Sequence, residues 1–157
     1  SQEDIEGIND GDLAKDKSSL SKEEKNDILS FFETQLKDRV SGVSDSKRLV
    51  DSPCSLVTPK DGMTAQMEKM MKMMDQKFKG EKRNLEVNMN HPIIKNMSEI
   101  LQKDKKNPFL KDSVEQLFEN SLLIEGLLEN PVQVLTRFQK FMESASAYEL
   151  GKISGKK

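Results

Sequence analysis

The 157-residue sequence has little of the residue types on which most catalytic and nucleic-acid-binding sites depend. It contains one cysteine, one histidine, one tyrosine and no tryptophan, and its formal net charge is -2. A lone cysteine forms no internal disulfide, which fits a reducing compartment, so we expect a cytoplasmic protein. Without a basic surplus or stacking aromatic side chains the chain offers little to a nucleic acid, and we expect no such partner.

Long hydrophobic runs and glycine-rich loops are also missing. No stretch of eighteen apolar residues occurs, so we expect no membrane partner. The eight glycines are scattered rather than gathered in a phosphate-binding loop. A zinc site or a cysteine–histidine catalytic pair would have only His91 and Cys54 to draw on. We interpret His91 as a turn or capping residue before Pro92, and Cys54 as a packed small hydrophobe.

Methionine is the residue type in surplus. Six of the nine methionines lie within residues 62–80. On a helix spanning residues 63–79, methionine and phenylalanine share one face, while Glu68, Lys72 and other charged residues follow the opposite face. The apolar face comprises Met63, Met67, Met70, Met71, Met74 and Phe78. The pattern predicts a strongly amphipathic helix.

Two interpretations of this methionine face compete. Methionine is an ordinary gap-filler, which favours a place in the protein's own core. The other predicted helices use leucine, isoleucine and valine, however, and this one uses none. Flexible thioethers are common where one surface accepts partners of different shapes, so we favour an adaptable contact surface. A copper(I) site lacks a nearby histidine, and the matched lysines and acids of the segment disfavour an anionic membrane.

The chain divides into an ordered domain and two polar ends. Residues 1–19 are acidic with isolated apolar positions, which predicts a flexible linker or the end of a preceding domain. The ordered domain is predicted over residues 20–148. Its first helix begins with a capping-box spacing at Ser21. Residues 149–157 are predicted to be disordered.

The elements of the domain follow from alternation and from proline positions. Residues 43–50, 54–58 and 84–89 alternate or are rich in β-branched side chains, which predicts three short strands. Three helices follow, and each has a proline near its first turn behind a capping candidate, at Pro92, Pro108 and Pro131. The predicted fold class is α+β, with a small three-stranded sheet and a helical end.

The helical end predicts a second copy of the chain. Five of the seven residues from 122 to 128 are large and apolar, and on a helix they point in nearly every direction. The short connection at residues 129–131 makes the last two helices an antiparallel hairpin. Two hairpins related by a two-fold axis would close a four-helix bundle, and a monomeric helical lid is the alternative.

Several sequence pieces together resemble one known family. They are KRLVDSP at residues 47–53, MTAQM at 63–67, LEVNMNHPI at 85–93 and ENP at 129–131, with the leucine pair at 122–123. In order and spacing they resemble the C-terminal domain of the ninety-kilodalton heat-shock chaperones, most closely that of the bacterial members. The resemblance runs from about Ser21 to Tyr148.

The resemblance implies contact between the methionine helix and non-native client proteins. Met63, Met67, Met70 and Met71 fall on the family's apolar positions. Met74 and Phe78 extend the same face by helical spacing alone. A stand-alone methionine-rich adaptor that binds amphipathic helices of partner proteins is the alternative function.

The resemblance also implies a homodimer, joined by the last two helices in a four-helix bundle. This agrees with the argument from residues 122–128. The expected interface comprises Leu117, Phe118, Ser121, Leu122, Ile124, Leu128, Val134, Leu135, Phe138, Phe141, Met142 and Ala145.

In this family ATP and Mg²⁺ bind to an N-terminal domain, and a middle domain assists hydrolysis. The resemblance therefore implies an ATPase only in the complete chaperone, and no catalytic residue, cofactor or metal in the present segment. Eukaryotic cytosolic members end in an acidic pentapeptide that recruits co-chaperones. This sequence ends in ISGKK, so we expect no acidic-tail-dependent co-chaperone and a bacterial-like origin.

Overall fold

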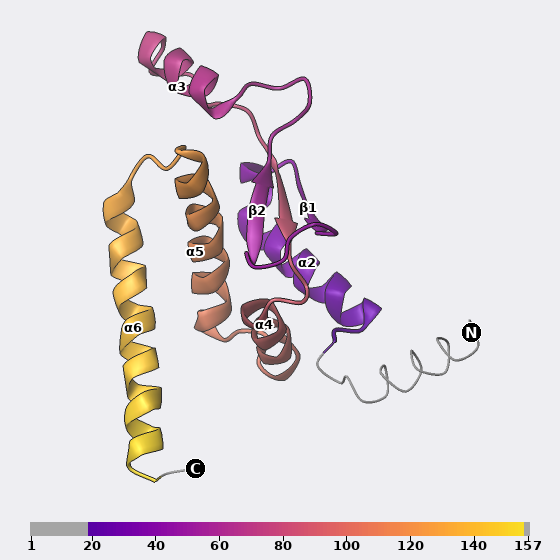
Figure 1. Ribbon diagram of the computed structural model, residues 1–157, viewed down its shortest axis with the longest axis vertical. Coiled ribbons are helices and arrows are strands. Elements are labelled where there is room, and N and C mark those ends of the chain that lie inside the picture. Colours follow the sequence, from indigo (N-terminus) through magenta and orange to yellow (C-terminus); the bar gives the residue numbers. More distant parts are fainter. Residues whose placement is uncertain (1–18, 156–157) are drawn as a thin grey trace, which may run out of the picture.

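The computed structural model describes residues 19–155 (Figure 1). In chain order the elements are α2 (Lys22–Leu36), the 3-10 turn η1 (Lys37–Arg39), β1 (Gly42–Asp45), β2 (Cys54–Val57), α3 (Ala65–Met74), β3 (Asn84–Val87), α4 (Pro92–Lys103), α5 (Pro108–Glu125) and α6 (Pro131–Ile153). The predicted order and the α+β class with one three-stranded sheet are confirmed. The predicted linker falls almost wholly on residues 1–18, which lie outside the described residues, as do residues 156–157.

Local sequence sets the helix starts. Ser21 Oγ accepts the N–H of Glu24 at 3.1 Å, and the Ser21 N–H donates to the Glu24 carboxylate at 2.8 Å, which confirms the capping box. The prolines at 92, 108 and 131 each open a helix. His91 caps α4, because its Nδ1 accepts the N–H of Ile93 at 3.1 Å. The interpretation of His91 as a capping residue is confirmed.

The sheet has β3 at its centre. β3 runs parallel to β1 and antiparallel to β2, with Leu85 opposite both Val43 and Leu56. The predicted first strand, residues 43–50, is too long, because β1 ends at Asp45. Beyond that point Ser46 Oγ accepts the N–H groups of the following turn, which diverts the backbone from the ladder.

One face of the sheet faces the core. Inward residues alternate along the strands, as Leu85 and Val87 do in β3, and they meet the apolar sides of α2, α4 and α5. Most outward residues, apart from Val57 and Gly42, are polar, and Asn84 donates to Ser44 Oγ at 2.8 Å. The buried apolar residues form one core cluster, which includes Cys54 as predicted: Ile28, Phe32, Leu36, Val40, Val43, Cys54, Leu56, Leu85, Val87, Met89, Ile94, Met97, Leu101, Leu110, Val114, Leu117 and Phe118.

Two helices lie outside this core. α6 runs beside α5 along one side of the molecule, while α3 projects beyond the end of the sheet (Figure 1). No side chain of α6 is buried, and the single buried side chain of α3 is Glu68. The predicted disorder from residue 149 is wrong up to Ile153, because α6 continues to that residue. The two helices therefore carry most of the large exposed apolar side chains of the described residues.

Candidate interaction surfaces

The α3 arm, residues 58–83, leaves the sheet after β2 and returns to it at β3. α3 begins after Thr64, whose Oγ1 accepts the N–H of Met67 at 3.2 Å. It ends at Met74, because Asp75 is extended and its carboxylate accepts the N–H of Lys77 at 3.0 Å. The predicted helix over residues 63–79 is therefore too long, and Phe78 lies beyond it, partly buried.

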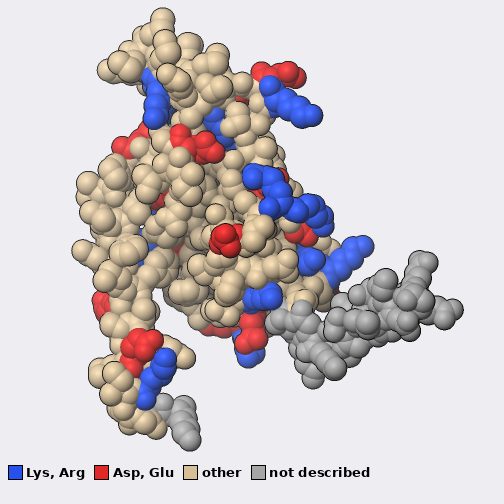
Figure 2. Space-filling view, in the orientation of Figure 1, with Lys and Arg blue, Asp and Glu red and all other residues tan. Residues whose placement is uncertain are grey.

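The methionines of α3 face outward. Met67, Met70, Met73 and Met74 are exposed, with 57% of Met70 accessible, whereas Met63 and Met71 are partly buried. In the space-filling view the tip of the molecule formed by this arm shows mostly uncharged atoms (Figure 2). By contrast, Met97 of α4 is fully buried. The methionine surface, defined as Met63, Met67, Met70, Met71 and Met74, is open to contact.

Glu68 lies on the buried side of α3. Only 4% of this residue is exposed, and its carboxylate accepts a hydrogen bond from Arg83 at 2.8 Å. Lys72, which shares the polar face of α3 with Glu68, pairs instead with Glu129 at the α5–α6 connection. α3 is thus seated on a charged residue.

α5 and α6 form the predicted antiparallel hairpin (Figure 1). Phe109 near the start of α5 meets Phe141 edge-on, with ring centroids 5.6 Å apart. Further along α5, Glu119 pairs with Arg137 at 2.5 Å. These two contacts show that α5 and α6 run antiparallel.

The exposed side of α6 carries a regular apolar row. Leu135, Phe138, Met142 and Ala145 recur at spacings of three and four residues, which places them on one face. All four are exposed, and 53% of Phe138 is accessible. We refer to these four residues as the α6 seam. Leu123 and Ile124 at the end of α5 are exposed as well.

The twelve predicted interface residues do not share one surface. Leu117, Phe118 and Ser121 are buried inside this chain and offer little surface to a partner. Their burial follows from the packing of α5 against the sheet and α2, and the predicted interface stays a prediction. Leu122, Leu128, Val134 and Phe141 are partly buried, and Ile124, Leu135, Phe138, Met142 and Ala145 are exposed.

The helix that was predicted to be apolar all round ends earlier than expected. α5 stops at Glu125, and Gly126 takes a left-handed conformation with φ 72°. Its N–H and that of Leu127 reach back to carbonyls of the last turn, as in a Schellman motif. Leu127 and Leu128 therefore lie in the α5–α6 connection, not on the helix.

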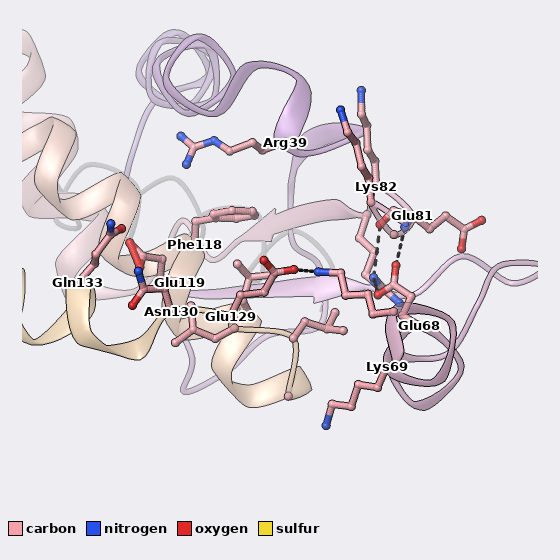
Figure 3. Close-up of a pocket in the computed structure, with 18 of the residues that line it drawn as sticks. Arg39, Glu68, Lys69, Glu81, Lys82, Phe118, Glu119, Glu129, Asn130 and Gln133 are labelled. Carbon is pink, nitrogen blue, oxygen red and sulfur yellow. Dashed lines mark hydrogen bonds and ion pairs between the residues drawn. The ribbon is translucent and has the colours of Figure 1, made fainter. Parts of the chain in front are cut away.

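A cleft of about 1080 Å³ separates α3 from the α5–α6 connection. Its charged walls include Glu68 and Lys69 of α3 on one side and Glu119 of α5 on the other (Figure 3). Its apolar lining comes from Met73 of α3 and from Phe118, Leu122, Leu127 and Leu128.

An ion pair fixes one wall of this cleft. Arg39 of η1 donates from Nη1 to Oε1 of Glu115 at 2.8 Å, and the Gln35 amide donates to the same carboxylate at 3.1 Å. The hydrogen bonds from Arg39 lower the pKa of Glu115, and the same interaction raises the pKa of Arg39. The contact joins η1 to α5.

Over residues 19–155, no three histidine, cysteine, aspartate or glutamate side chains gather closely enough to hold a metal ion. Within the same range, none of the helices is both long and apolar enough to cross a membrane. Burial raises the pKa of the Cys54 thiol to about 12, which keeps it protonated at neutral pH.

Comparison with known proteins identifies the family. A family model described as Hsp90 protein matches residues 1–154. The chain belongs to the Hsp90 family. Chaperone protein HtpG of Chlorobium chlorochromatii is 40% identical over 121 residues, which cover 77% of this chain and 19% of that protein. The HtpG of Geobacter sulfurreducens is 40% identical over 116 residues, covering 74% and 17%.

A third relative, HtpG of Oleidesulfovibrio alaskensis, is 36% identical over 121 residues and is covered to 19%. This Hsp90-family chain thus spans about a fifth of the length of the curated relatives it matches. Sequence reasoning missed two of its structural residues, Glu68 and Arg83, because their contact joins positions fifteen apart in the chain. The glycines at 62 and 80, one before and one after α3, were the available signal in the sequence.

Proposed function

We propose that this domain is the C-terminal domain of an Hsp90-family chaperone, which joins two copies of the chain and presents the methionine surface to client proteins. The observation that carries the proposal is α6, a helix of 23 residues with no buried side chain and a regular apolar seam. Contiguous exposed apolar surface of this kind marks an interaction site. The curated relatives are named as chaperones, which supports the assignment.

The seam suits a two-fold partner. Its residues recur at coiled-coil spacing, and the hairpin with α5 supplies two of the four helices of a bundle. A two-fold axis would bring the same seam of the second copy against it, because an isologous interface uses one patch twice. In this proposal Leu123 and Ile124 extend the interface, while Leu117, Phe118 and Ser121 remain in each protomer's core.

The dimer is tested by placing a charge in the seam. We expect Phe138→Asp to convert dimers to monomers in sedimentation velocity, because an unpaired carboxylate in an apolar interface is costly. Thr136→Asp is the matched control, since this exposed residue lies on the opposite side of α6 and adds the same charge. A dimer that persists in Phe138→Asp at micromolar concentration would refute the seam as the interface.

The methionine surface is the proposed contact for clients. Exposed thioethers adapt to differently shaped apolar segments, and non-native proteins offer many such segments. Met67→Glu with Met70→Glu should weaken the suppression of client aggregation by the complete chaperone and leave dimerisation intact. Gln66→Glu with Gln76→Glu adds the same charge at exposed positions of the arm and should have little effect. Equal activity of the two double variants would contradict client contact by this surface.

In this proposal the domain itself performs no nucleotide chemistry. Binding and hydrolysis of ATP with Mg²⁺ belong to the N-terminal and middle domains of the complete chaperone, as the resemblance implies. The domain contributes by holding two such chains together. Membership of the Hsp90 family disfavours the alternative of a stand-alone methionine-rich adaptor.

A further inference from the structure

An amphipathic helix beside a partly apolar cleft ordinarily turns its apolar face inward. α3 does the opposite. Glu68 is 4% exposed, while the methionines on the far side of the helix are open to solvent. Phe118, Leu122 and Leu127 line the cleft beneath and could cover methionine side chains. Something other than apolar burial therefore sets the rotation of this helix.

A closed set of polar contacts holds Glu68 in place (Figure 3). One Glu68 oxygen accepts from Arg83 Nη1 at 2.8 Å, and the other accepts the N–H of Glu81. Arg83 Nη2 donates to the carbonyl of Met63 at 3.0 Å, and the Glu81 carboxylate accepts the N–H of Met63 at 2.7 Å. We call Glu68, Glu81 and Arg83 the clasp. It ties the segment that enters α3 to the segment that leaves it.

Two glycines make room for the clasp. Gly80 has φ +79°, and a Cβ at this position would lie 2.7 Å from Glu68 Oε1. A Cβ at Gly62 would collide with the carboxylate of Glu81. The two glycines therefore leave room for carboxylates, the buried one of Glu68 beside Gly80 and that of the more exposed Glu81 beside Gly62.

Stability alone does not account for such a pair. Replacing a buried ion pair by apolar residues is often neutral or stabilising, whereas removing one partner leaves a costly unpaired charge. What a buried pair supplies is one defined geometry. The guanidinium of Arg83 and the carboxylate of Glu68 meet in one rotation of α3, and in that rotation the methionines face outward.

We propose that Glu68 and Arg83 are positioning residues, which keep the methionine surface outward and prevent α3 from rolling it into the adjacent cleft. The inference rests on the proposed role of that surface in client contact. When the clasp opens, α3 turns its methionines toward Phe118, Leu122 and Leu127, and the surface is withdrawn. Lys72 lies one turn after Glu68 on the same side of α3 and pairs with Glu129 across the cleft, but this pair is far more exposed to solvent than that of Glu68 and Arg83.

Cysteine labelling of this chain measures the rotation directly. Cys54 is its one cysteine, and it is buried with a pKa of about 12, so it gives little background. Met70→Cys places a thiol on the outward face, and Ala65→Cys places one on the seated face beside Glu68. Each is labelled with a thiol reagent in the native background and in Arg83→Gln.

The two thiols should respond in opposite directions. In Arg83→Gln we expect the thiol at position 70 to react more slowly and that at position 65 faster, each by about fivefold or more. Arg83→Lys should restore part of the native ratio. Faster labelling at both positions would overturn the proposal, because it means a loosened arm and not a rolled one. Unchanged labelling at both would also overturn it.

A second variant and a control keep the test independent of folding defects. Gly80→Ala opens the clasp without altering either charge, since its Cβ would press on Glu68, and it should give the same opposite changes. Glu99→Gln removes an exposed ion pair with Lys103 and should change neither rate.

Client binding is measured separately in the complete chaperone. If labelling shows that α3 rotates but Arg83→Gln still suppresses client aggregation normally, the positioning role of Glu68 and Arg83 is supported and client contact by the methionine surface is refuted. If Met67→Glu with Met70→Glu weakens client binding but labelling is unchanged in Arg83→Gln, the client surface stands and the clasp fails.

Discussion

α3 and α6 both expose large apolar side chains, but the two helices differ in composition and in what fixes them. α6 carries leucine and phenylalanine at regular spacing, and ion pairs and an aromatic contact hold it along α5. α3 carries methionines and is held by the clasp at its base. Stiff, regularly spaced side chains suit one partner of fixed geometry, whereas flexible ones suit many partners. The difference supports the proposed roles, self-association for α6 and variable contact for α3.

The most direct test of this comparison replaces one buried and one exposed methionine by alanine. Met97→Ala in α4 should lower the free energy of unfolding by about 2–5 kcal/mol, because it leaves a cavity in the core. Met70→Ala in α3 should change it by less than about 0.5 kcal/mol, because that side chain is exposed. Urea unfolding of the two variants measures both values. Similar losses of unfolding free energy in the two variants would mean that Met70 is packed in the core rather than exposed.

The contribution of each of two ion pairs to the attachment of α6 along α5 can be compared by removing them one at a time. Arg137→Ala leaves the largely buried carboxylate of Glu119 without its partner and should cost about 2 kcal/mol. Lys140→Ala removes the more exposed pair with Asp112 and should cost less than about 1 kcal/mol. Chemical denaturation at a fixed protein concentration compares them. If Lys140→Ala proved the more damaging, the hairpin would be held at a different place from the one described.

The smallest expected effect concerns the acid stability of the body to which both helices attach. Arg39 lowers the pKa of Glu115, so the ionised carboxylate stabilises the folded state above its ordinary pKa near 4.5. That contribution is lost as the pH falls below this value. Unfolding between pH 6 and 3 should therefore depend on pH less steeply in Glu115→Gln, by less than about 1 kcal/mol. An equally steep dependence in Glu115→Gln would show that the Arg39–Glu115 pair does not contribute to the pH dependence of folding stability.

Sequence reasoning found the features that depend on neighbouring residues. The capping box at Ser21, the cap at His91 and the proline starts of the last three helices are all encoded within a few positions. Alternation located β3 because its buried and exposed side chains follow the pleat. The α+β class followed from these elements together.

What the sequence concealed depends on distant residues. Helical spacing continues through Phe78, but Asp75 ends α3 with its own side chain, and periodicity alone does not reveal that choice. Glu68 looks like a solvent-facing residue until Arg83 is placed beneath it. Leu117 and Phe118 looked available to a partner because the sequence does not say how much of α5 the sheet and α2 cover. β3 lies between β1 and β2 for the same reason, since strand pairing is not local.

Val57 and Asn84 are register partners in adjacent antiparallel strands, although residues 58–83 separate them in sequence. The methionine arm is, topologically, one enlarged hairpin loop that departs and rejoins at a single place. A tight turn could replace it and leave the β2–β3 ladder closed. A loop of this kind tolerates changes of length at little entropic cost, so the methionine arm can lengthen or shorten without altering the sheet or the α5–α6 hairpin.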